Sequence, residues 1–178
     1  MLTARLVLIP VLALFGAAHA QAPRATYPTK PIRMIVGFPA GGPSDILGRL
    51  VAQKLTEAFP HQTIVDNRAG ASGNIGAELV AKSPPDGYTL LLIPATHAVN
   101  PSIYKKVPYD PLRDFTMVSL VAEGPFILVV HPSLPAKNVQ DLIALARKRP
   151  GELNYASASL GGLPHLSGEL LKSMTASR

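Results

Sequence analysis

Apolar and polar residues follow two different periods along residues 32–94, and their alternation predicts the type of fold. Strand-like runs occupy residues 32–38, 63–67 and 89–94. Helix-like segments, with apolar residues every three or four positions, occupy residues 44–59 and 75–83. Because strand and helix alternate three times, we expect an α/β fold with a parallel sheet and crossover helices.

The segment 44–59 carries the clearest helix signal. Its apolar positions are Leu47, Leu50, Val51, Leu55 and Ala58. Ser44 suits the N-cap of this helix, and Asp45 suits the N1 position, where a carboxylate interacts favourably with the helix dipole. Asn74 is expected to start the next helix, with its side chain capping a turn.

The pattern changes after the third predicted strand. Two apolar runs, residues 115–123 and 126–132, flank Gly124 and Pro125, which indicates a hinge or crossover leading to a second lobe. In that lobe we expect, in order, a strand in 126–132, a helix from about Val139 to Arg149, a short strand in 153–159 and a final helix after a glycine-rich turn.

These elements divide the chain into a first α/β lobe at residues 21–124 and a second at residues 125–178. A lobe with only two strands leaves a parallel sheet without neighbours and one apolar face uncovered. We therefore expect the second lobe to be incomplete and the chain to be truncated at its C-terminal side.

The first 20 residues have the features of an export signal. One basic residue, Arg5, precedes an apolar stretch that ends in Ala-His-Ala, the small-residue pattern read by signal peptidase. The apolar stretch is shorter than the roughly 20 residues that span a bilayer, which disfavours a membrane anchor. We expect cleavage before Gln21 and a periplasmic protein.

Composition narrows the class of protein further. The chain has no Cys, so an exported form is stabilised by its core and not by disulfides. The formal net charge is +6, from 17 Lys and Arg against 11 Asp and Glu, and removal of Arg5 with the leader leaves +5. The basic clusters at 105–106 and 147–149 are not interleaved with aromatic residues, so they indicate a solvated surface and no nucleic-acid partner.

The residues 38–45, Phe-Pro-Ala-Gly-Gly-Pro-Ser-Asp, connect a predicted strand to a predicted helix. A helix N-terminus offers unpaired N–H groups and a partial positive charge, which together favour an anion. The available donors are the backbone N–H groups of Phe38, Ala40, Gly41, Gly42 and Ser44. Both phosphate-binding signatures, Gly-Lys-Ser/Thr and G-x-G-x-x-G, are missing, so a carboxylate is the simpler ligand.

The residues 155–170, YASASLGGLPHLSGEL, repeat the same arrangement in the second lobe. Small residues and two glycines again precede a proline and a helix. Two such turns, one on each lobe, can hold one anionic ligand from both sides, since domain interfaces are favoured sites for ligands.

Four blocks of the sequence together resemble the tripartite tricarboxylate transporter substrate-binding proteins, the Bug (TctC-like) family. The blocks are YPTKPIRMIVGFPAGGPSDILGRLVAQKL, DNRAGASGNIGAELVAKSPPDGYTLLL, THAVNPSIY and YASASLGGLPHLSGELLK. The resemblance implies a two-lobed type II periplasmic-binding-protein (Venus flytrap) architecture, with the second lobe incomplete. It also implies capture of a small carboxylate for a membrane permease, or for a sensor protein.

The resemblance implies roles for particular residues. The backbone from Phe38 through Ala40 and Gly41 to Gly42 would hold a ligand carboxylate, and Asp45 would influence the choice of ligand. From other segments, Thr96, His97, Ser157, Gly161 and Gly162 would contribute to the cleft. Many family members carry a serine where Ala158 stands and a Ser or Thr where Gly162 stands, so this second turn lacks two hydroxyl groups.

Other chemistries have weaker support. No carboxylate or Cys stands at ligand spacing from His97 or His165, which disfavours a metal, and His165 is expected to cap or pack at its helix start. Ser44, His97 and Asp114 could on paper form a Ser-His-Asp triad, but the sequence has no G-x-S-x-G nucleophile elbow to support a hydrolase. We expect a monomeric binding protein without cofactor or catalysis. The alternatives are an exported α/β enzyme acting on a carboxylic acid and a non-functional truncated fragment.

Overall fold

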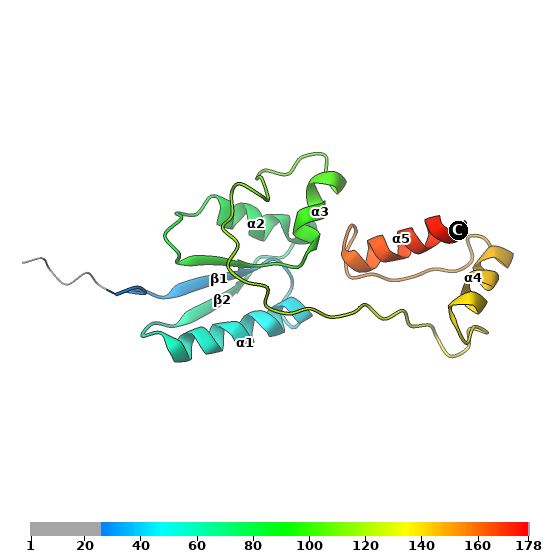
Figure 1. The fold of residues 1–178 in the computed structure, drawn as a ribbon, viewed down its shortest axis with the longest axis horizontal. Coiled ribbons are helices and arrows are strands. Elements are labelled where there is room, and N and C mark those ends of the chain that lie inside the picture. Colours follow the sequence, from blue (N-terminus) through cyan, green and yellow to red (C-terminus); the bar gives the residue numbers. More distant parts are fainter. Residues whose placement is uncertain (1–25, 178) are drawn as a thin grey trace, which may run out of the picture.

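The computed structural model describes residues 26–177, so the predicted signal peptide lies outside the described residues. We distinguish a first region, residues 26–115, a connecting segment, residues 116–138, and a second region, residues 139–177 (Figure 1). The first region contains the sheet. The second region contains two helices, and in the same view the first of them lies near the C-terminal end of the second.

The first region follows the predicted alternation of strand and helix. Its elements in chain order are β1 (Ile32–Val36), α1 (Pro43–Ala58), β2 (Thr63–Asn67), the 3₁₀ turn η1 (Ala71–Gly73), α2 (Asn74–Ala81), β3 (Thr89–Leu92) and α3 (Thr96–Ile103). The strands form one parallel sheet in the order β2-β1-β3. Ile32 pairs with Thr63 on one side of β1, and Arg33 pairs with Thr89 on the other. The predicted parallel sheet is confirmed.

The helices α1 and α2 cover opposite faces of β1. A Cβ at Gly48 of α1 would lie 2.9 Å from Val36 Cγ2, whereas one at Gly76 of α2 would lie 3.2 Å from Ile35 Cγ2. Because side chains alternate along a strand, Val36 and Ile35 point to opposite faces. β1 is therefore buried on both sides, and Ile32, Ile35 and Val36 are almost fully enclosed.

The base of the first glycine turn packs directly on the start of α2. A Cβ at Gly37 would lie 3.0 Å from Gly73 Cα, and one at Gly76 would lie 3.1 Å from Gly37 Cα. Gly73 also has a positive φ of 91°, a conformation that suits glycine. The three glycines let the backbones meet without intervening side chains.

The second region has helices where they were predicted but not the strands. Its helices are α4 (Val139–Lys148) and α5 (Leu163–Thr175), joined by hydrogen bonds from the Arg147 guanidinium to the Thr175 carbonyl. The strands predicted in 126–132 and 153–159 are not formed, and the apolar run 115–123 is not in a sheet either. A strand requires a partner with free N–H and C=O groups, and no described segment pairs with these residues.

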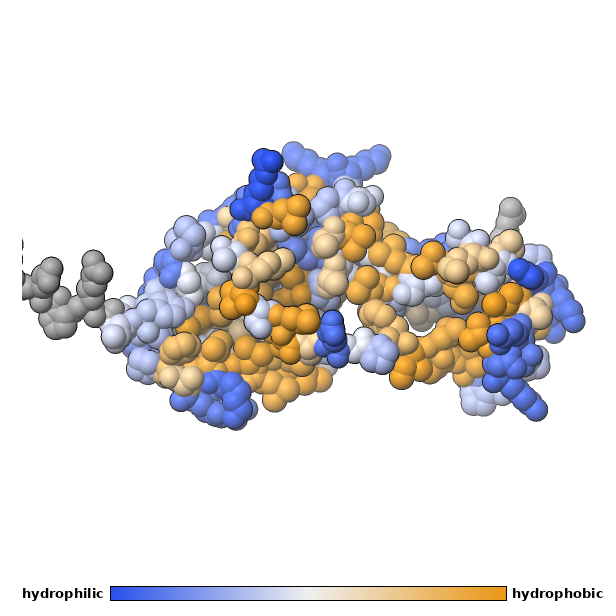
Figure 2. All heavy atoms as spheres, in the orientation of Figure 1, coloured by the Kyte–Doolittle hydropathy of each residue, from blue (hydrophilic) through white to orange (hydrophobic). Residues whose placement is uncertain are grey.

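Apolar side chains remain exposed along the connecting segment. Ile127 and Val129 are each 79% exposed, and Val118 is 85% exposed. Figure 2 shows apolar residues gathered on the surface over α1 and along the connecting segment. None of the helices among residues 26–177 combines the length and the apolar character needed to cross a membrane.

Candidate ligand-binding site

The first glycine turn, residues 37–42, joins β1 to α1 at the carboxyl edge of the sheet. Gly41 has a φ of +81°, which favours glycine, and its N–H donates to Asp45 Oδ2 at 2.8 Å. The Gly42 N–H donates to the Pro39 carbonyl at 3.4 Å. Two of the five predicted donors therefore have partners nearby, in the turn or in the first turn of α1. The N–H groups of the other three, Phe38, Ala40 and Ser44, make no hydrogen bond within residues 26–177.

The start of α1 differs from the sequence prediction by one residue. Gly42 is the N-cap, Pro43 is the first helical residue, and Ser44 lies inside the helix, so the prediction of Ser44 as N-cap is wrong. Proline is well suited to the first helical position because its missing N–H is not needed there. Asp45 consequently stands at N3 and not at N1.

Asp45 is buried at the base of the first turn. Its Oδ2 accepts from Gly41 N–H and from Arg49 Nε at 3.0 Å. The Arg49 guanidinium, followed by the Gly41 N–H, lowers the pKa of Asp45 to about 2, so it is a carboxylate at neutral pH. The other oxygen, Oδ1, is buried without a hydrogen-bond partner among the described residues.

The second glycine turn, residues 157–162, has the same local structure. Gly161 has a φ of +75°, and its N–H donates to His165 Nδ1 at 3.2 Å. The Gly162 N–H donates to the Ser159 carbonyl at 3.1 Å, and Gly162 is the N-cap of α5. His165 was predicted to cap or pack at its helix start, and it accepts here from the residue that precedes the N-cap. The Ser157 hydroxyl is bonded within the turn, to the Ser159 carbonyl at 3.3 Å.

The second turn is attached to the first region by residues that follow β2. The Ser72 hydroxyl donates to the Leu160 carbonyl at 2.7 Å. Ile103, at the end of α3, packs against Gly161, where an added Cβ would lie 2.8 Å from Ile103 Cδ1. Figure 1 shows the start of α5 next to α3. The structure therefore brings the second turn to the end of the first region at which α1 begins.

Thr96 and His97 lie in the first turn of α3 and are buried. His97 Nδ1 lies 3.3 Å from the Tyr109 hydroxyl, and its ring stacks on Tyr109 with Phe115 at its edge. Burial lowers the pKa of His97 below its ordinary value, so the imidazole is neutral at neutral pH. Thr96 Oγ1 and His97 Nε2 have no partner among the described residues.

The Asn74 side chain belongs to a buried network and not to a helix cap. Its Oδ1 accepts from Asn100 Nδ2 and from the Tyr109 hydroxyl, each at 2.6 Å. Asn100 Nδ2 also donates to the Ser72 carbonyl at 3.2 Å, and Tyr104 donates to the Ser72 hydroxyl at 3.1 Å. The prediction of Asn74 as a capping side chain is therefore wrong, because its oxygen is already shared by two partners from later in the chain.

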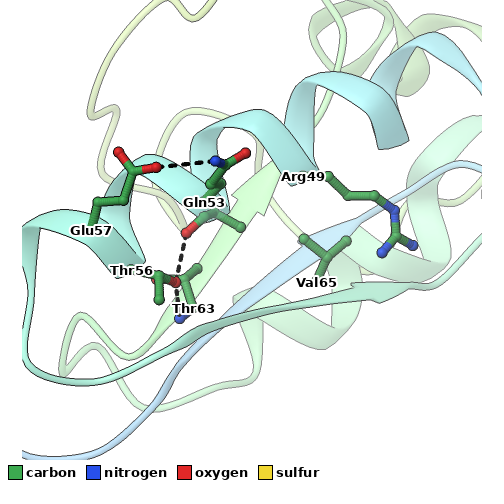
Figure 3. A pocket seen from close by; sticks show the side chains of 7 residues that line it. Arg49, Gln53, Thr56, Glu57, Thr63 and Val65 are labelled. Atoms are coloured by element: carbon green, nitrogen blue, oxygen red, sulfur yellow. Dashed lines mark hydrogen bonds between the residues drawn. The ribbon is translucent and has the colours of Figure 1, made fainter.

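Two grooves on the flanks of α1 lie away from both glycine turns. One, of about 400 Å³, is lined by α1 and the edge strand β2 (Figure 3). Gln53 donates to Glu57 one turn further along α1, and the Thr63 N–H of β2 donates to Thr56 Oγ1 of α1. The other, of about 370 Å³, lies between apolar residues of α1 and Val121. Both grooves are open and follow exposed edges of the fold, so they do not replace the turns as the candidate site.

Metal chemistry has no structural basis in the described part of the chain. Between residues 26 and 177, no three His, Asp or Glu side chains are grouped as metal ligands. What the two regions do share is a pair of helix N-termini with glycine turns, an arrangement that suits a small anion.

Comparison with known proteins identifies the family. Residues 47–177 match the family described as the tripartite tricarboxylate transporter family receptor, and the chain belongs to this family. BugT of Bordetella pertussis is 43% identical over 152 residues, covering 84% of this chain and 47% of BugT. A UPF0065 protein in the tcbD-tcbE intergenic region of Pseudomonas sp. (strain P51) is 42% identical over 145 residues, covering 82% and 43%. The chain spans about half the length of these relatives.

Solved structures show the same architecture. An R. palustris protein with adipate is 46% identical, with a TM-score of 0.80 over 85% of this chain and 51% of that protein. MatC from Rhodopseudomonas palustris with bound malate is 29% identical, with a TM-score of 0.75 over 85% and 52%. The periplasmic binding protein BugD is 32% identical, with a TM-score of 0.69 over 85% and 51%. These likenesses and the parallel sheet confirm the predicted α/β periplasmic-binding-protein class.

The polar residues around the attachment of the second turn were not predicted from the sequence. Ser72 makes the contact with Leu160. Asn100 and Tyr104 bond to Ser72, and Tyr109 bonds to Asn74. The sequence signal for Ser72 was the glycine-rich segment in which it stands. In the structure, the flanking Gly70 and Gly73 both have positive φ. Ser72 itself has a φ of +53°, an uncommon conformation for a residue with a side chain.

Proposed function

We propose that this protein takes part in the capture of a small carboxylate in the periplasm, for delivery to the permease of a tripartite tricarboxylate-type transporter. The observation that carries the proposal is the pair of glycine turns. They have a similar φ at their first glycine and a similar extended N-cap, and Ser72 attaches the second to the first region. Helix N-termini with exposed backbone N–H groups bind carboxylates without a cationic side chain.

The ligand class is supported by the names of two similar structures. One R. palustris protein was solved with adipate and MatC was solved with malate, and both ligands are dicarboxylates. A molecule with two carboxylates offers one negative group to each turn. The basic surplus of this chain favours the approach of such an anion.

Each predicted site residue has a place in this proposal. The N–H groups of Phe38, Ala40 and Ser44 are the donors left free at the first turn among the described residues, and Gly41 and Gly42 allow close approach. Ser157, Gly161 and Gly162 form the second turn. Thr96 and His97 are buried, so we assign neither a direct ligand contact. His97 supports the site through Tyr109 and Asn74.

A matched pair of glycine substitutions tests the proposal. Gly41 and Gly151 have φ values of +81° and +78°, and a Cβ at either would have no neighbour within 4 Å. Alanine costs about 1–2 kcal/mol of backbone strain at either position. By calorimetric titration with adipate and malate, we expect Gly41→Ala to weaken binding about tenfold or more and Gly151→Ala to leave it unchanged. Equal affinities for the two variants, or no binding of either acid by the wild type, would contradict the proposal.

The proposed chemistry is reversible binding by a monomer, in which no bond is made or broken. Native mass spectrometry distinguishes this from catalysis, because a bound acid is recovered with its mass unchanged. The proposed export has its own measurement. Cleavage before Gln21 predicts that the protein recovered from the periplasm has Gln21 as its first residue, and an intact leader would contradict this.

A further inference from the structure

The two glycine turns share a hydrogen bond that holds the backbone of the turn. In the first turn, the Gly41 N–H donates to a side-chain oxygen four residues later, at Asp45. In the second turn, the Gly161 N–H donates to a side-chain nitrogen four residues later, at His165. Asp45 and His165 are also both the third helical residue, counted from Pro43 and Leu163. The chemistry of the two side chains differs, but each accepts through an atom at the δ position.

The effect of this bond follows from the conformation of the glycine that donates it. A glycine with φ near +80° is free to rotate to many other conformations, since it lacks a Cβ. When a side chain of the following helix accepts the N–H of this glycine, the glycine backbone loses that freedom. The neighbouring N–H groups, which the proposed function assigns to the ligand, then keep their direction before the ligand arrives, and this lowers the cost of binding.

We propose that Asp45 and His165 are equivalent positioning residues, each of which fixes one ligand-binding turn by accepting the N–H of its left-handed glycine. This inference rests on the proposed function. It explains why a carboxylate is tolerated beside an anion site. Asp45 Oδ2 is occupied by Gly41 and Arg49, so the carboxylate acts on the backbone, and its charge is paired.

The same inference fixes the tautomer of His165. To accept from Gly161, Nδ1 must carry no proton, so the ring N–H is on Nε2. Tyr155 stacks on this ring at 6.3 Å between ring centres, and Glu169 follows in the next turn of α5. Asp45 accepts as a carboxylate, because the Arg49 guanidinium lowers its pKa to about 2.

The substitutions are chosen to separate the acceptor from the shape of the side chain. Asp45→Leu and His165→Phe keep a similar volume but remove the δ acceptor. Asp45→Asn and His165→Asn keep an oxygen at the δ position. Asp141→Leu is the control, because the Lys137 N–H donates to Asp141 Oδ2 at 3.0 Å with the same spacing at the start of α4, where there is no glycine turn.

Two measurements are made on each variant of the full chain. The first is the ¹⁵N-glycine spectrum with amide exchange rates, which reports the Gly41 and Gly161 hydrogen bonds without any ligand. The second is the affinity for adipate and for malate by calorimetric titration. We expect Asp45→Leu and His165→Phe to move the signal of their own glycine to higher field, speed its exchange and weaken binding about tenfold, a loss equivalent to one hydrogen bond.

The expected rescue is recovery of both readouts in Asp45→Asn and His165→Asn, with affinity within about threefold of the wild type. Asp141→Leu should alter neither. The inference is overturned if the asparagine variants lose as much affinity as the leucine and phenylalanine variants. It is also overturned if the glycine signals change while affinity does not. If the wild type binds neither acid, the proposed function fails, and the glycine spectra show separately whether the two side-chain bonds exist. His165, which is only half buried, keeps the test valid if an Asp45 variant does not fold.

Discussion

The first and second regions contain the same kind of glycine turn but differ in everything that surrounds it. In the first region the turn follows a strand with a partner on each side and a helix on each face. In the second region no described strand precedes the turn, and α5 has no fully buried residue. The first glycine nevertheless has a similar positive φ in both turns, and its N–H donates to the side chain four residues later in both. Turn geometry is thus set by a few local residues, whereas a sheet and its core require partners from distant parts of the chain.

The largest expected effect comes from truncating equivalent apolar side chains in the two environments. Ile35 in β1 is fully buried, whereas Ile127 in the connecting segment is 79% exposed. Ile35→Ala should lower the free energy of unfolding by about 2–5 kcal/mol, because it removes buried surface and leaves a cavity. Ile127→Ala should change it by less than about 0.5 kcal/mol. Urea unfolding followed by circular dichroism measures both, and a similar cost for the two would remove the distinction between the regions.

A smaller effect is expected from the polar groups that stabilise each region. Asn100→Ala leaves the Ser72 carbonyl and Asn74 with one donor fewer in a buried site, which should cost about 1–3 kcal/mol of global stability. Asn138→Ala removes the exposed N-cap of α4, which accepts from the Asp141 N–H at 2.9 Å. This substitution should destabilise α4 by about 1 kcal/mol, and the effect should be detected only as faster amide exchange in α4. Equal and global losses would show that the two regions unfold as one unit.

The contact between the regions should contribute about 1 kcal/mol. Ser72→Ala removes the hydroxyl that bonds to Leu160 but keeps the unfavourable φ of +53°. Ser72→Gly also removes the hydroxyl, and it relieves the backbone strain. Both variants should speed amide exchange at residues 160–162 by about fivefold, whereas only Ser72→Ala should lower global stability. Unchanged exchange in both variants would mean that Ser72 does not hold the second turn.

The smallest effect concerns pH and is confined to the first region. Burial lowers the folded-state pKa of His97 below the ordinary 6.5, so just below pH 6.5 the unfolded chain binds more protons than the folded chain. Stability should therefore fall as the pH decreases from about 7 to 5. The free energy of unfolding should change with pH by less than about 1.4 kcal/mol per pH unit, which is the limit for a difference of one bound proton. His97→Phe should flatten this dependence, and His131→Phe, at an exposed position, should not. A slope unaffected by His97→Phe would assign the dependence to another group.

Most of the first region could be predicted from the sequence because its signals are local. The strand at 63–67 was predicted with its observed bounds, and α1 was displaced by one residue because Pro43, and not Ser44, begins the helix. The helix α3 was missed, since it has only eight residues and contains Pro101. A short helix with an internal proline depends on tertiary contacts, here those of Asn100 and His97.

The second region and the connections of the site show where local reasoning fails. The apolar runs 115–123 and 126–132 have strand-like sequences, but without pairing they stay extended and exposed. The glycine turn at 157–162 was recognised because the glycine, proline and helix pattern is contained in eight residues. Ser72 was not recognised, because its partner Leu160 is 88 positions away and neither residue type indicates such a contact.

The close packing of Gly37, Gly73 and Gly76 has a mechanical consequence. Where two backbones are in contact, no side chains lie between them that could rearrange and absorb a displacement. If residues 38–42 moved, η1 would be expected to move with them, because Gly37 and Gly73 are in backbone contact. The hydrogen bond from Ser72 to Leu160 would pass part of that displacement to the second turn, so the two halves of the proposed site would be coupled through the protein before any ligand bridges them.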